Sequence, residues 1–104
     1  MITSKREITL AKLTKVADLL KVMAHPVRLE ILEALEVEKH LSVGAIQDLI
    51  ASDVEQSLLS HHLIKMKDKG LLTCHREGKS IHYAITDTEI LKIFDCLENC
   101  KLIL

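Results

Sequence analysis

The sequence predicts a mainly α-helical chain that carries one small β-hairpin near its C-terminal end. Apolar residues recur at helical spacing in four segments of the first 70 residues and again after residue 87. Between them, LLTCHR and SIHYAI have the composition and length of short β strands, and the EGKS segment joins them through a glycine. The core must be aliphatic, because Tyr83 and Phe94 are the only aromatic residues.

The length and composition indicate one ordered domain that spans residues 1–104. A chain of 104 residues has the ordinary size of a single domain. Charged residues at 28% and a single proline argue against disorder. A domain this small buries a modest share of its surface, so a second copy of the chain would add useful burial.

The first two helices are predicted before residue 38. One spans about 8–23, with an apolar face, and Pro26 opens the next at a position where its missing N–H costs nothing. The second helix is expected to bury Ile31, Leu32 and Leu35. The apolar face of the first comprises Leu10, Leu13, Val16, Ala17 and Leu20.

Two further helices are predicted between residues 42 and 70. Ser42 is placed to cap a short helix that carries Ile46, Leu49 and Ile50. A longer helix then runs from about 55 to 69 and ends at Gly70, which is suited to the left-handed conformation of a helix C-terminus.

The C-terminal third is predicted to contain the hairpin and a last helix. The hairpin occupies about 71–86, with Gly78 in its turn, and Asp87 caps a helix over about 88–102. Its apolar stripe comprises Ile90, Ile93, Phe94, Leu97 and Cys100. The resulting order, α-α-α-α-β-β-α, is the outline of a winged helix-turn-helix.

The predicted helix 55–69 has two unlike sides. On a helical wheel Leu59, Leu63 and Met66 form one side, flanked by Leu58 and His62. Hydroxyl, imidazole and ammonium groups, which hydrogen-bond base edges and phosphates in a major groove, gather on the other side. That side comprises Ser57, Ser60, His61, Ile64, Lys65 and Asp68.

The adjacent histidines of this helix are predicted to face different ways. Neighbours on a helix do not converge on one ion, so His61 and His62 are poor partners for a metal. We expect His62 to have a structural role at the edge of the core. For His61 we favour contact with DNA over a plain solvated side chain.

Charge is distributed unevenly although the net charge is only −1. Residues 1–25 carry a net +3, residues 26–60 a net −5, residues 61–85 a net +3 and the last segment a net −2. Residues 61–85 also hold four of the six histidines. A locally basic segment on a small acidic protein is a weak sign of phosphate binding, and a mixed surface is the ordinary alternative.

These residues together resemble the ArsR/SmtB family of bacterial repressors. The resemblance rests on Leu29, Ile31 and Leu32 after His25-Pro26, on the pattern from Gln56 to Leu71, and on Arg76-Glu77-Gly78-Lys79 with Tyr83. It implies a homodimeric winged helix-turn-helix protein that binds an inverted repeat in double-stranded DNA and leaves it when an inducer binds. The first and last helices would form the dimer interface.

The resemblance also assigns DNA contacts residue by residue. Gln56, Ser57, Ser60 and His61 would form the base-reading set, with Lys65 on the same face. Arg76 and Lys79 would be the cations of the wing. Ile64 stands at a position that is often polar in the family, so it either touches a thymine methyl or lies exposed.

The inducer site is less well defined by the sequence. The third helix lacks the cysteines of one family metal site, and only Asp87 remains of a second site on the last helix, where it is more simply an N-cap. Cys96 and Cys100 lie four residues apart and are therefore expected near one edge of the last helix, a spacing that suits a thiophilic metal or metalloid or an oxidation sensor. Packing as small buried hydrophobes is the alternative. For Cys74, on the first hairpin strand, we favour a packing role over a role as a metal ligand.

Other functional classes receive less support. A winged helix that docks a protein instead of DNA would favour an exposed apolar patch, and only Ile64 interrupts the polar side of the helix. No phosphate loop, nucleophile elbow or paired-carboxylate motif indicates an enzyme. No apolar run suits a membrane span, the N-terminus lacks the apolar region of a signal peptide, and three cysteines fit a reducing cytoplasm.

Overall fold

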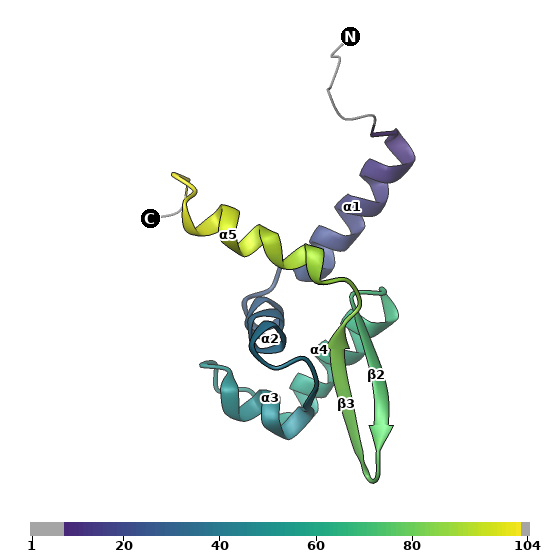
Figure 1. Ribbon diagram of the computed structural model, residues 1–104, viewed down its shortest axis with the longest axis vertical. Helices are drawn as coiled ribbons and strands as arrows, with labels where there is room; N and C mark the ends of the chain where they lie inside the picture. The colour runs from purple at the N-terminus through teal and green to yellow at the C-terminus, as the bar shows by residue number, and fades with distance from the viewer. Residues whose placement is uncertain (1–7, 103–104) are drawn as a thin grey trace.

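The computed structural model describes residues 8–102. The helices are α1 (Leu10–Met23), α2 (Pro26–Val37), α3 (Val43–Leu49), α4 (Gln56–Asp68), the 3₁₀ turn η1 (Thr88–Leu91) and α5 (Lys92–Glu98). The strands are β1 (Leu41–Ser42), β2 (Leu72–Glu77) and β3 (Ser80–Ile85). Figure 1 shows α2, α3 and α4 grouped together, the β2–β3 hairpin beside them, and α1 and α5 extending away from this group.

The hairpin belongs to a three-stranded antiparallel sheet with the order β1-β3-β2. The prediction of a hairpin was correct, but the sequence analysis missed β1. This strand has two residues, and it pairs Leu41 with Tyr83 and Ser42 with His82. A segment this short has no alternating pattern of its own, because its partner lies about forty residues away in the chain.

The predicted helix signals are confirmed at most boundaries. The Ser42 hydroxyl accepts a hydrogen bond from Ala45 N at 3.2 Å and caps α3. The His25 ring accepts one from Val27 N at 3.2 Å at the start of α2, where Pro26 takes the first helical position. Gly70 has a φ of 83°, the left-handed conformation expected after α4, and Gly78 has a φ of 61° in the hairpin turn.

The last helix differs from the prediction. Asp87 is an N-cap as expected and accepts a hydrogen bond from Glu89 N at 2.9 Å. The segment that it caps, however, is the 3₁₀ turn η1 and not an α-helix. The α-helix that follows ends at Glu98, so it does not extend to residue 102. Cys100 therefore lies beyond α5, whereas Cys96 lies within it.

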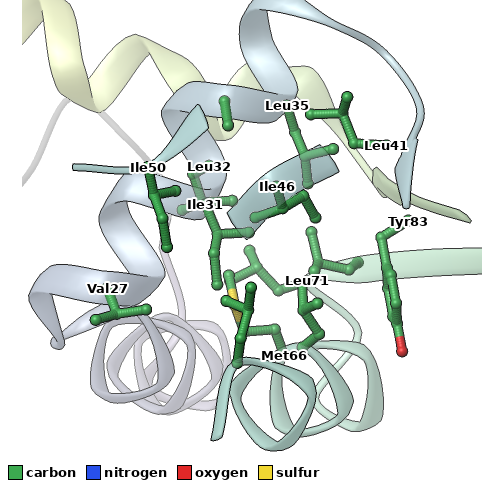
Figure 2. Close-up of a cluster of buried hydrophobic side chains, with 14 of the residues drawn as sticks. Val27, Ile31, Leu32, Leu35, Leu41, Ile46, Ile50, Met66, Leu71 and Tyr83 are labelled. Carbon is green, nitrogen blue, oxygen red and sulfur yellow. The ribbon is translucent and has the colours of Figure 1, made fainter. Parts of the chain in front are cut away.

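The core lies where α2, α3 and α4 meet the sheet (Figure 2). The side chains with 2% exposure or less are Met23, Ile31, Leu32, Ile46, Leu59, Leu63, Met66 and Leu72. Tyr83 closes the side next to the sheet at 5% exposure. The buried set includes Ile31, Leu32 and Leu35 of α2 as expected, whereas Leu49 of α3 is 55% exposed.

We expect the substitution Leu59→Ala to destabilise the fold strongly and Leu58→Ala to have little effect. Leu59 is fully buried, so its truncation should lower the free energy of unfolding by about 2–5 kcal/mol through lost burial and a residual cavity. Leu58, the next residue on α4 toward its start, is 51% exposed, and its truncation should cost about 0.5 kcal/mol or less. Denaturant unfolding at one fixed protein concentration measures both. Equal losses would contradict the packing described for α4.

Candidate nucleic-acid interface

α3 and α4 form a helix-turn-helix whose connection is held by a residue of α2. The Glu30 carboxylate accepts hydrogen bonds from Ala51 N at 2.7 Å and Ser52 N at 3.2 Å, and a short one from the Ser52 hydroxyl. The hydrogen bond from the Ser52 hydroxyl and those from the two backbone groups hold the pKa of Glu30 below its ordinary value. The side-chain amide of Gln47 donates to Val54 O at 2.8 Å. These bonds fix how α4 leaves α3.

The two sides of α4 are separated as predicted. Leu59, Leu63 and Met66 are fully buried, whereas the opposite side is exposed at Gln56, Ser57, His61 and Lys65 and half-buried at Ser60. Ile64 is 46% exposed on this outer side. Leu58 was expected beside the core but is 51% exposed. The outer side of α4 therefore presents polar groups, and the exposed apolar side chains of Leu58 and Ile64 lie near them.

His62 lies on the buried side of α4 and is bonded to α2. It is 6% exposed, and its Nδ1 accepts a hydrogen bond from Arg28 Nε at 3.0 Å. The Arg28 guanidinium also donates to Val22 O at 3.0 Å, and the His25 ring lies 4.4 Å from the His62 ring between centroids. Burial lowers the pKa of His62, and electrostatic interactions with His25, Arg28 and His61 lower it further.

The wing places Lys79 beside the start of α4. Arg76 on β2 and Lys79 in the hairpin turn are both exposed. One shallow hollow is lined by Gln56 of α4 and Lys79 of the wing, together with Ser42, Gly44 and Ser80. Gln56 and Lys79, two predicted DNA contacts that are distant in the sequence, thus lie on one surface.

The three cysteines are free and do not lie together in one site. Cys74 on β2 and Cys96 on α5 are exposed, and Cys100 beyond α5 is half-buried. Among residues 8–102, no group of three or more His, Cys, Asp and Glu side chains is arranged to hold a metal ion. The expectation that Cys96 and Cys100 share one edge of the last helix was wrong, because the helix ends before Cys100.

α1 exposes apolar side chains, and the apolar side chains of α5 are half-buried. On α1, Leu13 is 49%, Val16 41% and Leu20 44% exposed, although the spacing of these residues is that of a buried face. α5 contains no buried residue. In the part of the chain that the structure describes, no helix is long and apolar enough to cross a membrane.

α4 is the second helix of the helix-turn-helix, and its outer side is polar. A hairpin with exposed cations follows it in the chain. This arrangement defines a winged helix-turn-helix of the DNA-binding type. Residues 23–75 match the model of a helix-turn-helix domain family. The transcriptional repressor PagR of Bacillus anthracis is 38% identical over 81 residues, which are 78% of this chain and 79% of that protein. Its crystal structure aligns with a TM-score of 0.73 over 86% of this chain and 99% of that one.

Two further proteins extend the comparison. The cadmium resistance transcriptional regulatory protein CadC of Listeria innocua is 33% identical over 86 residues, 83% of this chain and 71% of its own length. A solution structure from Mycobacterium bovis is 27% identical and aligns with a TM-score of 0.72 over 93% of this chain and 87% of that one. It is described as a homodimeric winged helix-turn-helix DNA-binding domain of a possible ArsR-family transcriptional regulator.

The chain belongs to this helix-turn-helix family and is a transcriptional regulator of the ArsR/SmtB type, not an enzyme. The family and the two sides of α4 could be identified from the sequence. The roles of Arg28 and Glu30, the residues of α2 that hold α4 and the turn before it, could not. The pattern His25-Pro26 with a following arginine was the available signal, but only the fold shows what Arg28 bonds.

We expect His62 to make stability depend on pH. An unfolded chain protonates histidine near pH 6.5, whereas folded His62 takes up its proton only at lower pH. The folded chain therefore binds fewer protons between these two values. The contribution of His62 to stability is fully present above about pH 6.5 and is lost as the pH falls through the lower, folded pKa. His62→Gln keeps an oxygen that accepts the Arg28 hydrogen bond and removes the titrating group.

Denaturant unfolding from pH 7.5 to 5 measures the difference between wild type and His62→Gln. The wild type should lose more stability over this range than the variant. Parallel pH profiles for the two proteins would show that His62 contributes nothing to the dependence.

Proposed function

We propose that this protein is a homodimeric transcriptional repressor that binds an inverted repeat in double-stranded DNA, with α4 in the major groove. The observation that carries the proposal is the exposed polar side of α4 beside the cationic wing. Gln56, Ser57 and His61 lie there on a helix whose other side is fully buried. A recognition helix presents its early residues to base edges in this way.

The proposed contacts divide by chemistry. Gln56, Ser57, Ser60 and His61 have groups that hydrogen-bond base edges, and Ile64 is exposed enough to touch a thymine methyl. Lys65, Arg76 and Lys79 carry charges that attract phosphates without reading sequence. Because one protomer offers few cations at this surface, two protomers are needed for useful attraction.

The exposed apolar face of α1 supports the proposed dimer. Residues at the spacing of a buried helical face gain from burial, yet in one protomer Leu10, Leu13, Val16 and Leu20 remain exposed. A second copy that packs against α1 and α5 would cover them. The related Mycobacterium bovis domain is homodimeric. A symmetric dimer matches an inverted repeat, because each α4 then reads one half-site.

A protein-docking module without specific DNA binding is the alternative function. Exposed Leu58 and Ile64 on α4 are the features that would favour it. The named relatives include a transcriptional repressor and a DNA-binding domain, and these favour the repressor. As a DNA-binding regulator the protein would act in the cytoplasm.

We expect His61→Ala and Arg76→Ala to weaken DNA binding in different ways. His61→Ala should cost about 1–3 kcal/mol on the operator and much less on random DNA, because it removes a hydrogen bond to a base. Arg76→Ala should weaken both DNAs alike and make the slope of log K against log salt shallower by about 0.9 for each phosphate that is no longer neutralised. Fluorescence anisotropy on DNA from upstream of the gene measures both effects.

Two controls make this experiment decisive. Scrambled DNA gives the nonspecific affinity, and an operator with one scrambled half-site should bind the wild type far more weakly if the dimer reads both halves. If His61→Ala and Arg76→Ala both weaken the two DNAs equally, the assignment of His61 to base reading is wrong. If the wild type does not prefer the operator, the docking function gains the support.

We propose that a thiophilic metal or metalloid, or oxidation, releases the DNA through Cys96 and Cys100. Cys96 is exposed and therefore open to either reagent, and Cys100 lies just past the end of the same helix. α5 is also half of the proposed dimer interface, so a change at Cys96 would act on dimer geometry. The related CadC is a cadmium resistance regulator.

We expect Cys96→Ser to leave operator affinity within about twofold of wild type and to abolish the response to cadmium or to peroxide. Cys74→Ser is the matched control, because Cys74 is also exposed and free but lies on the wing. Anisotropy before and after each treatment measures the response. A Cys96→Ser, Cys100→Ser double variant that still releases the DNA would return these cysteines to a packing role.

A further inference from the structure

The outer face of the wing carries a concentration of metal-ligating side chains that DNA binding does not use. These are His40 before β1, His75 and Glu77 on β2, and His82 on β3, and we call them the wing histidine cluster. We propose that this cluster is a binding site for a divalent transition-metal ion of the zinc class, with His75, His82 and Glu77 as ligands and His40 beside them. This inference does not depend on the proposed function.

The register of the sheet brings the three ligands to one face. His75 is directly opposite His82 on the neighbouring strand, and Glu77 is opposite Ser80. Because side chains alternate along a strand, Glu77 points to the same face as His75, two residues earlier. The other face carries Tyr83, which is 5% exposed in the core. The cluster therefore faces away from the core.

His75 and His82 each lie close to the Glu77 carboxylate. His75 Nε2 lies 3.1 Å from Glu77 Oε1, and His82 Nε2 lies 3.6 Å from Glu77 Oε2. Two atoms bound tetrahedrally to one zinc ion at 2.0–2.1 Å are roughly 3.3 Å apart. The His75 and His82 rings are stacked with centroids 5.6 Å apart, and the His40 ring lies 5.1 Å from that of His75.

The chemistry of the ligands fits the same class of ion. Imidazole suits zinc, copper and nickel, and a carboxylate completes common three-ligand zinc sites that keep one position open. The hydrogen bond from His75, with smaller electrostatic contributions from His82 and His40, holds the pKa of Glu77 below its ordinary value. Arg76 lies between His75 and Glu77 on β2 and points to the opposite face.

The cluster requires a small rearrangement before it holds an ion. His75 and His82 approach different oxygens of Glu77, so the three groups do not yet surround one point, and no ready-made ligand group exists among residues 8–102. The Glu77 and His75 side chains are 62% and 41% exposed, so both rotate without disturbing the core. His82 is 23% exposed and serves as the more fixed ligand. An ion would replace the two polar contacts to Glu77 with three coordinate bonds.

The test is zinc binding to the full-length protein without DNA, measured by competition with a chromogenic chelator. His75→Ala and His82→Ala should each weaken zinc affinity by more than about 10-fold, since even outer-shell changes typically cost 10–100-fold. Glu77→Gln should also weaken binding, and it leaves the strand pairing intact. His61→Ala is the matched control, because it removes an exposed histidine on α4, and its zinc affinity should equal that of the wild type.

A second measurement separates this site from the cysteines. In a Cys74→Ser, Cys96→Ser, Cys100→Ser variant, which has no thiol, zinc should still bind with the affinity of the wild type. Imidazole NMR signals of His75 and His82 should shift on zinc addition in a protein whose spectrum is otherwise unchanged. Failure to bind zinc, loss of binding only with the cysteine variant, or wild-type affinity in both His75→Ala and His82→Ala would overturn the proposal.

Discussion

The burial of one side of α4 is the constraint on which the rest of this structure depends. Leu59, Leu63 and Met66 have no exposed surface, and they pack where α2, α3 and the sheet meet. A helix rotated by one residue would expose this stripe and bury polar groups, which costs several kcal/mol. The buried stripe thus fixes the rotation of α4. The same rotation turns Ser57 and His61 outward, so the packing of the buried side decides which side chains are exposed.

Two sets of hydrogen bonds from α2 position that helix further. Glu30 holds the turn before α4, and Arg28 holds His62 within it while also bonding the end of α1 through Val22 O. The two hydrogen bonds of Arg28, a residue of α2, therefore connect α1, α2 and α4 beside the core. Arg28 is thus bonded both to α4 and to α1, the helix that we propose at the dimer interface.

The wing sheet has two faces with different properties. Its inner face buries Tyr83 and Leu72 and joins the core, and the pairing of β1 with β3 ties the hairpin to the loop before α3. Its outer face gathers the wing histidine cluster. Arg76 and Lys79, near the tip, carry the charge suited to phosphate. Because alternation along each strand separates these groups, one short hairpin serves packing, DNA attraction and the proposed ion site without conflict.

The sequence by itself determined the features that depend on neighbours in the chain. The period of apolar residues predicted α4 and its buried side, Ser42 and Gly70 predicted helix ends, and Gly78 predicted the hairpin turn. The tertiary structure decided what depends on distant residues. The two-residue β1 exists only because Tyr83 and His82 lie beside it, and the bond from Arg28 to His62 joins residues 34 positions apart. Likewise α5 ends at Glu98 although its apolar pattern continues, and His40 meets His75 only through the sheet. Local patterns carry propensity and burial, whereas contacts between distant segments follow from how the elements pack.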